Sequence, residues 1–270
     1  MSKETRTVRY DEDLGLEAYR FQGIVQPFPN HFHDYYVIGY VEAGLRRLFC
    51  KNREYIIKQG DILLFNPHDN HGCTQSGGET LDYREINIPE DAMLWLSGEI
   101  SGEGKLWRFS QNVVADHDAA LCLRSLHQMM MAGGERFAKE EALLLLLSML
   151  MERYGEAFAY RVPECGEGLE KACAFMEEHY AERISLEQVC RCSALSGSSL
   201  LRAFTREKGV TPDRYLQSIR VSRAKALLEA GVSPIEAALQ AGFSDQSHLS
   251  NCFHTYIGLS PAAYRRIFQN

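Results

Sequence analysis

Two segments near the end of the chain share one spacing of residues. The run SALSGSSLLRAFTREKGVTPDRY (193–215) is matched by AGFSDQSHLSNCFHTYIGLSPAAY (241–264). Both runs carry the same residues at the same intervals, 49 positions apart: Leu200, Phe204, Gly209, Pro212 and Tyr215 recur as Leu249, Phe253, Gly258, Pro261 and Tyr264. The repeat predicts two successive helical modules of the same kind.

Each module opens like a capped helix. Ser185 stands three residues before Gln188, and Ser233 three residues before Glu236, which is the spacing of a capping box. A short helix (185–192 or 233–240) then meets a turn of small residues, and a second helix follows. Apolar residues four apart on that second helix are expected to be buried. The pattern is typical of a helix-turn-helix and places the two motifs at about 185–207 and 233–256.

The other face of each second helix is mostly polar. It carries Ser198, Ser199, Leu201, Arg202, Thr205 and Arg206 in the first module, and Gln246, Ser247, His248, Ser250 and Asn251 in the second. Most of these side chains can hydrogen-bond to base edges or to phosphates. The helix expected between the motifs, from Pro212 to Ala230, would be roughly 28 Å long. Successive major grooves on one side of DNA are ~34 Å apart.

Residues 185–267 resemble the paired helix-turn-helix domain of AraC-type transcription regulators. The match rests on the AGFSDQSHLS run, the phenylalanine after it and the Gly-x-Ser-Pro-x-x-Tyr ending. The resemblance implies base contacts at Ser198, Ser199, Leu201 and Arg202, and at Gln246, Ser247, His248, Ser250 and Asn251. Leu201 replaces a commonly polar residue and Asn251 a frequent arginine, and we expect Arg206 to contact a phosphate or an acid. The alternative is a helical bundle whose polar faces only meet water.

The net charge of −7 is unevenly distributed along the 270 residues. Residues 181–270 carry +4, so residues 1–180 carry −11. We therefore expect the positively charged C-terminal part to attract the phosphates of DNA. The length favours two domains, which we place at 1–159 and 168–270 with a linker at 160–167.

The N-terminal half shows a pattern of short strands. After a polar arm (1–20), strands are expected at 35–41, 45–50, 54–57, 62–66 and 81–88, with turn residues between them. This predicts a small β-barrel or sandwich. Two helices, 116–131 and 135–154, carry apolar residues on more than one face. Such helices need two neighbours, and a second subunit is one candidate, so we expect a homodimer; core packing alone is the alternative.

The runs HFHDYYVIGYVEAG and GDILLFNPHDNHG resemble the two half-motifs of the cupin barrel used for effector sensing in AraC-type proteins. The implied fold class is α+β: a cupin-like barrel at about 20–90 with helices at about 116–156, then an all-α domain. His31, His33 and His71 fall at or near the metal-binding histidine places of cupins, but Val37 occupies the glutamate place. We therefore expect these histidines to border an effector site and the protein to need no metal or other cofactor. A three-histidine metal site is the alternative.

Arg84 is predicted to share a strand face with Ile86 and Ile88. A buried guanidinium is costly unless an anion pairs with it. That anion is either an internal carboxylate or the acid group of an effector, so Arg84 joins the three histidines as a candidate effector-binding residue.

Three features bear on the compartment. The eight cysteines form no C-x-x-C pair, which favours reduced thiols over a zinc site at Cys190 and Cys192. The N-terminus lacks the apolar core of a signal peptide. The longest apolar run, 142–151, is half a membrane span. We expect a cytoplasmic protein with no membrane association.

These observations predict a transcription regulator that binds double-stranded DNA under the control of a small-molecule effector, without enzymatic activity. RNA polymerase is a candidate partner. Two other functions are open: a metal-dependent cupin enzyme fused to a DNA-binding domain, and an effector-independent DNA-binding protein whose barrel serves dimerisation. Bound metal with turnover would favour the first of these, and a filled barrel the second.

Overall fold

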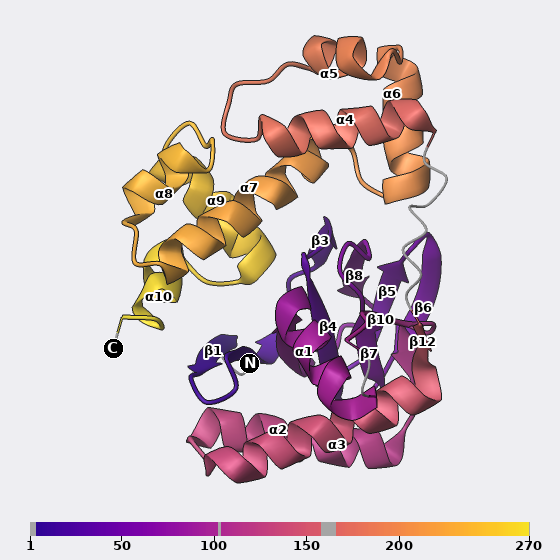
Figure 1. Ribbon diagram of the computed structural model, residues 1–270, viewed down its shortest axis with the longest axis vertical. Helices are drawn as coiled ribbons and strands as arrows, with labels where there is room; N and C mark the ends of the chain where they lie inside the picture. Colours follow the sequence, from indigo (N-terminus) through magenta and orange to yellow (C-terminus); the bar gives the residue numbers. More distant parts are fainter. Residues whose placement is uncertain (1–3, 102–103, 158–165, 270) are drawn as a thin grey trace. The chain divides into compact units, whose positions relative to one another are not determined.

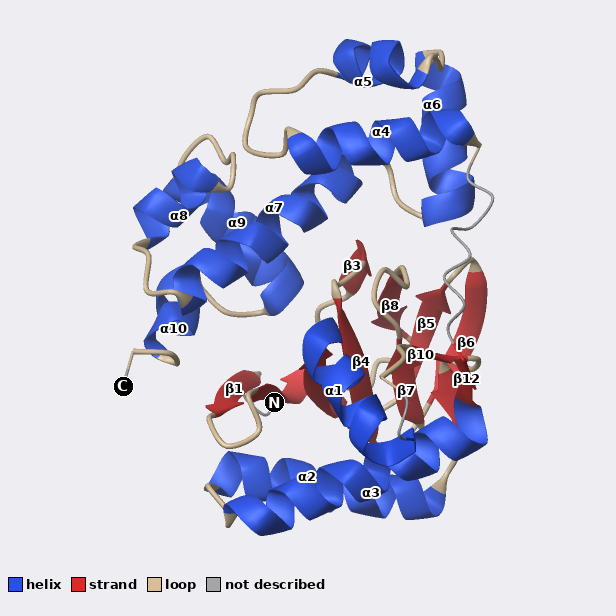
Figure 2. Ribbon diagram, in the orientation of Figure 1, coloured by secondary structure: helices blue, strands red, loops and turns tan. Residues whose placement is uncertain are grey.

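The computed structural model describes residues 4–101, 104–157 and 166–269. The chain forms two compact units, one from residues up to 159 and the other from residue 160 onward, with the short segments Phe28–Phe32 and Asn70–Gly72 grouped with the second. The first unit is rich in strands and the second is helical (Figure 2). The predicted linker falls almost wholly on residues outside the described ranges.

The N-terminal part alternates short strands with few helices. Its elements are β1 (Thr5–Asp11), β2 (Leu16–Ile24), β3 (Phe28–His31), β4 (Tyr35–Ala43), β5 (Arg46–Cys50), β6 (Arg53–Ile57), β7 (Ile62–Phe65), β8 (His71–Gln75), β9 (Leu81–Pro89), α1 (Glu90–Ser101), β10 (Trp107–Phe109), β11 (Val113–Val114), α2 (His117–Ala132), α3 (Arg136–Tyr154) and β12 (Gly155–Ala157). The larger sheet has the order β1-β2-β9-β4-β7-β11, and a second sheet has the order β3-β8-β5-β6.

The larger sheet has two buried faces of different character. Side chains alternate along a strand, so the even-numbered residues of β2, β4 and β9 share one face. That face packs with α2 and α3 into one apolar core, which includes Ala18, Ile38, Ile86, Leu126 and Leu147. The odd-numbered residues form the opposite face. The second sheet lies near this face at β8, since the Cys73 thiol of β8 is close enough to Tyr83 of β9 to raise the pKa of Tyr83.

The expectation of a polar arm over residues 1–20 is wrong. Residues 5–11 form β1 and residues 16–24 form β2, paired antiparallel from Thr5 with Gln22 to Asp11 with Leu16. β1 is an edge strand whose residues alternate between exposed and half-buried. Its solvent-facing side chains therefore resemble those of a polar tail in the sequence. Only the pairing with β2 distinguishes an edge strand from such a tail.

The two predicted helices are present as α2 and α3, and they pack against each other below the sheet in Figure 1. Asp116 caps α2 by accepting a hydrogen bond from the Ala119 amide, and it also accepts from Arg153 of α3 at 2.7 Å. The third helix buries an unexpected Lys139. Its Nζ lies 2.6 Å from carboxylate oxygens of both Asp11 and Asp13, so α3 is tied to the β1–β2 turn.

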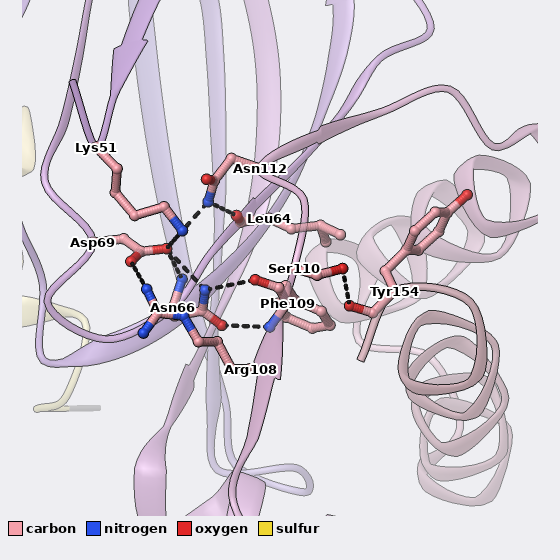
Figure 3. Close-up of polar contacts among 9 residues, drawn as sticks. All are labelled: Lys51, Leu64, Asn66, Asp69, Arg108, Phe109, Ser110, Asn112 and Tyr154. Carbon is pink, nitrogen blue, oxygen red and sulfur yellow. Dashed lines mark hydrogen bonds and ion pairs between the residues drawn. The ribbon is translucent and has the colours of Figure 1, made fainter. Parts of the chain in front are cut away.

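A buried carboxylate organises the turn after β7 (Figure 3). Asp69, 4% exposed, accepts hydrogen bonds from the side-chain amides of Asn66 at 2.8 Å and Asn112 at 3.1 Å. Asn66 in turn accepts from the Phe109 amide at 2.7 Å, and Asn112 donates to the Leu64 carbonyl at 2.8 Å. This network holds the segment with β10 and β11 against the end of β7.

The C-terminal part is all helical in its described residues. It comprises α4 (Glu167–Glu178), α5 (Leu186–Ser193), α6 (Gly197–Ala203), the π-helix η1 (Phe204–Lys208), α7 (Pro212–Glu229), α8 (Pro234–Gln240), α9 (Gln246–Ile257) and α10 (Pro261–Arg266). The predicted fold class, α+β with a β-rich N-terminal domain and a helical C-terminal domain, is confirmed. No helix among the described residues is long and apolar enough to cross a membrane.

We expect Asp69→Ala to destabilise the N-terminal unit by about 3 kcal/mol, because the substitution leaves the amides of Asn66 and Asn112 buried without their acceptor. Urea unfolding followed by near-ultraviolet circular dichroism measures the loss. The matched control is Glu12→Ala at an exposed turn position, which should change the midpoint little. Equal midpoints for the two variants would contradict the organising role of Asp69.

Candidate nucleic-acid interface and effector site

The two helix-turn-helix motifs have the predicted caps and cores. Both capping boxes are formed, by Ser185 with Gln188 and by Ser233 with Glu236. The repeated apolar residues are buried: Leu200, Phe204, Leu249, Phe253 and Tyr264 are each 0% exposed. Each second helix therefore has one face held in the core and its other face available to a ligand.

A hydrogen bond that the sequence did not reveal repeats in both modules. The Tyr215 hydroxyl donates to Glu177 of α4 at 2.6 Å, and the Tyr264 hydroxyl donates to Glu229 of α7 at 2.7 Å. Each tyrosine also packs edge to face on the phenylalanine of its module, with ring centroids 5.3 Å apart. A glutamate near the end of α4 or α7 thus holds the tyrosine that closes each module, and α7 joins the two motifs (Figure 1).

The turns of the motifs differ in backbone strain. The first module places Ala194 at φ 55°, a left-handed conformation that costs a residue with a Cβ about 1–2 kcal/mol. The second places Gly242 at φ 82°, where an added Cβ would lie 2.5 Å from the Tyr180 carbonyl oxygen. Only the second turn therefore requires glycine for space as well as for conformation.

The outward residues of the first motif lie on α6 and η1. Leu201, Arg202, Thr205 and Arg206 are exposed, and Ser199 is half-buried with its hydroxyl 2.9 Å from that of Ser196. Ser198 lies on α6, but its side chain is outside the described atoms. Leu201, at 42% exposure, presents an apolar surface where polar readout is usual.

The second helix of the first motif is not a regular α-helix throughout. From Phe204 to Lys208 it widens into a π-helical turn, which was not predicted. A π-turn closes hydrogen bonds from residue i to i+5 and takes an extra residue, so the outward face after Phe204 does not follow the spacing of a regular α-helix. Arg206 pairs with its neighbour Glu207, with Nε 2.5 Å from Oε1. An acid therefore lies beside Arg206, one of the two contacts expected for it.

The second recognition helix, α9, is regular and holds its first turn firmly. Asp245 caps it by accepting from the His248 amide at 2.8 Å. The His248 ring packs edge to face on Phe243 and lies 3.2 Å from the Ser244 hydroxyl. Gln246, Ser247 and Asn251 are exposed and Ser250 is half-buried. The helix start therefore presents Gln246 and Ser247 beside an imidazole with a defined orientation.

The odd-numbered face of the larger sheet carries polar side chains among aromatic and aliphatic ones. Strand register aligns Tyr19, Glu85 and Gly39 in one row, and Glu17, Asn87 and Val37 in the next. Burial, opposed by the Tyr83 hydroxyl and reinforced by the Glu17 charge, raises the pKa of Glu85 to about 8. The alternation along the strand is visible in the sequence, but Glu85 was not predicted as a site residue. The signal that would have pointed to it is a second acid, Glu17, which faces the same way on the adjacent strand.

The three predicted histidines come together. His31, His33 and His71 offer nitrogens that all lie within 4.8 Å of one another. His31 Nδ1 lies 2.7 Å from the Pro29 carbonyl oxygen, and burial lowers the pKa of His31 to about 4. A neutral ring oriented in this way suits a metal ligand. The carboxylate place still holds Val37, which is 1% exposed, so the cluster offers three imidazoles without the acid of the four-ligand cupin site.

Arg84 lies on the opposite face from Glu85, towards α2. Its Nε is 2.7 Å from Oε1 of Glu42, although the two atoms are not aligned as a hydrogen bond. Arg124 of α2 pairs with the same oxygen at 3.2 Å. The anion beside Arg84 is therefore the internal carboxylate, and we do not place Arg84 in the effector site.

Models of two protein families match the chain. Residues 13–147 match the AraC-like ligand binding domain, and residues 189–267 match a helix-turn-helix domain. The chain is 49% identical over 250 residues to the uncharacterized HTH-type transcriptional regulator YbfI of Bacillus subtilis, covering 92% of this chain and 91% of the relative. The chain belongs to the AraC-type family of transcription regulators.

More distant relatives agree with this assignment. The HTH-type transcriptional activator RhaS of Klebsiella pneumoniae is 28% identical over 253 residues, 88% of each chain. The crystal structure of ToxT from Vibrio cholerae matches with a TM-score of 0.54 and 18% identity, over 94% of this chain and 98% of ToxT. A structure of ToxT bound to an unsaturated fatty acid matches with a TM-score of 0.55 and 16% identity, over 99% and 98%. These structures show a shared fold.

As an AraC-type regulator, the protein should read bases through Arg202 more than through Arg206. We expect Arg202→Ala to cost ~1–3 kcal/mol in DNA binding and to relax preference at one base pair, and Asn251→Ala to cost less. Arg206→Ala should weaken binding to all DNA sequences about equally. It should also reduce the slope of log affinity against log salt concentration by about one at most. Titrations of single-base-substituted operators at two salt concentrations measure both effects. Unchanged affinity and preference in Arg202→Ala would show that the register is wrong.

We expect the AraC-type sensor to work without metal, because Val37 replaces the acidic ligand. Protein purified without metal-affinity steps should contain less than about one transition metal ion per two chains, and DNA binding should survive a chelator. Elemental analysis measures the content. Stoichiometric metal that disappears in His33→Ala would contradict this prediction.

Arg84→Met should lower stability by about 1 kcal/mol, since Glu42 keeps Arg124 as a partner and is partly solvated. The response of DNA binding to an effector should be retained. Arg124→Met is the matched variant on the same carboxylate. Loss of effector response in a folded Arg84→Met protein, but not in Arg124→Met, would return Arg84 to the effector site.

Proposed function

We propose that the C-terminal domain binds double-stranded DNA through α6 and α9, and that a small molecule on the odd-numbered face of the sensor sheet controls this binding. The observation that carries the proposal is the pair of matched motifs, each with a buried Leu-Phe-Tyr set and an exposed polar face. The site residues for DNA are Ser198, Ser199, Arg202, Arg206, Gln246, Ser247, His248, Ser250 and Asn251. The joining helix α7, with its 18 residues, spans roughly 27 Å, close to the spacing of successive major grooves.

The sensor half supports control by a ligand. A sheet face that carries the buried Glu17 and Asn87 and the half-buried Glu85 is costly unless these groups are paired, and a bound ligand would pair them. The three clustered histidines lie at the motif that the cupin resemblance marks, and we retain them as candidate effector contacts. We infer no catalytic role for them, because the homologues named above are transcription regulators.

We also propose that the protein is a cytoplasmic homodimer. Large apolar side chains remain exposed on α2 and α3: Leu121 at 50%, Leu145 at 55% and Phe137 at 78%. Burying such residues against a second copy would remove apolar surface from water. Contact with RNA polymerase at a promoter is a further proposed interaction.

The test is selection of duplex DNA from a random pool by the full-length chain, followed by titration of the selected site in the presence of a metabolite library. We expect two related half-sites and at least one compound that changes DNA affinity about fivefold or more. The complex should contain two chains by sedimentation. Failure to enrich any sequence would overturn DNA reading, and an unresponsive complex would favour a barrel used for dimerisation alone.

A further inference from the structure

The face of the sheet that the proposed function assigns to the effector has a specific chemistry. Glu85 stands at the centre of β9, between Tyr19 of β2 and Gly39 of β4. Glu17 lies on the same face of β2 and accepts a hydrogen bond from the Tyr19 hydroxyl at 3.2 Å. Opposite Glu85, Gly39 contributes no side chain, and the Tyr83 hydroxyl occupies the space above it, 1.7 Å from where a Cβ would lie.

Two polar atoms beside Glu85 are buried without a hydrogen-bond partner. They are the Tyr83 hydroxyl and the Asn87 Oδ1, on residues only 7% and 3% exposed. Both flank Glu85 on its own strand and share its face. The Tyr83 hydroxyl is close enough to lower the pKa of Glu85, yet its geometry does not make a full hydrogen bond. Buried polar atoms are normally paired, so this pair indicates a bound group.

The charges on this face indicate whether the bound group is a cation or an anion. Among the described residues, no lysine, arginine or histidine contributes to the pKa of Glu85, which burial raises to about 8. The buried Arg46 of the second sheet donates instead to the carbonyl oxygens of Ile24 and Val25. A cation would compensate the carboxylates of Glu17 and Glu85, whereas an anionic ligand would add repulsion to them.

Aromatic rings complete the arrangement. Tyr19 and Phe21 stack with ring centroids 5.9 Å apart, and Phe21 and Tyr83 stack at 6.0 Å. Carboxylates set among aromatic rings are the recognised environment of organic ammonium groups, because the ring faces attract a cation and tolerate its apolar substituents. A small metal ion has no comparable need of rings.

We propose that the effector is a small organic amine whose ammonium group pairs with Glu85, between Glu17 and the hydroxyl of Tyr83. This inference deepens the proposed function, since it rests on that face being the effector site. It names the ligand class, a monovalent organic cation with an apolar body, and it assigns the recognition of charge to Glu85.

The experiment compares matched probes by calorimetry on the full-length protein. Phenethylamine is set against phenethyl alcohol and phenylpropionate, and choline against its neutral carbon isostere dimethylbutanol. At least one amine should bind about tenfold or more tightly than its neutral partner, and the carboxylate should bind weakest. If neither amine exceeds its neutral partner, or if phenylpropionate binds best, the proposal is wrong.

Variants locate the binding. Glu85→Gln keeps the shape and removes the charge, so it should weaken the amine about tenfold or more, as should Glu17→Gln to a smaller extent. Glu12→Gln, at an exposed turn, is the matched control and should bind as the wild type does. Circular dichroism verifies that each variant is folded. Full affinity in Glu85→Gln would place the amine elsewhere and overturn the proposal.

The pH dependence gives a second readout. Glu85 must lose its proton to pair with an ammonium group, so choline affinity should rise with pH and level off above about 8. Glu17, Tyr19 and Tyr83 are the titratable groups that face it, and Glu85→Gln should remove the rise. DNA titrations in parallel distinguish the proposed effector control from the inferred class of effector. An amine that binds without changing the affinity for DNA would refute effector control. A compound other than an amine that changes the affinity for DNA would refute only the inference that the effector is an amine.

Discussion

The alternation of side chains across one antiparallel sheet is the constraint on which the sensor domain depends. Ile38 and Ile86 face the helices and join the apolar core, while Glu85 faces the other way into a second buried layer. One step along β9 therefore separates Arg84, paired with Glu42, from Glu85. A shift of register by one residue would exchange the two faces and bury the wrong charges against α2. The apolar face thus fixes the direction in which the polar face must point.

In the C-terminal domain the corresponding constraint is the buried tyrosine that ends each module. Tyr215 and Tyr264 fill their cores and reach back to Glu177 and Glu229. Because Glu229 ends α7, the helix that closes the first module also anchors the second. A rigid link of this kind sets the separation of the two recognition helices, and that separation is what a regulator needs to meet successive grooves.

Agreement between pattern and structure was best where local chemistry decides. The caps at Ser185 and Ser233, the small-residue turns and the burial of Leu249 and Phe253 all follow from spacing within one module. Strand pairing was less accessible: β1 looked like a tail because one side of an edge strand meets solvent. The partner of Arg84 also depended on a neighbour distant in sequence, and the π-turn in the first recognition helix had no signal in the helical pattern.

The sequence by itself determined that this chain carries two matched DNA-reading motifs behind a β-rich sensor, because caps, turns and helical periods are local and repeat 49 residues apart. The resemblance to the two cupin half-motifs also predicted that His31 and His33 lie close to His71, as they do. Only the tertiary structure decided which acids meet: Glu17 and Glu85 are far apart in the chain, and β2 and β9 become neighbours only when the sheet is assembled. The character of the sensor face is therefore a property of strand order, which no local pattern encodes.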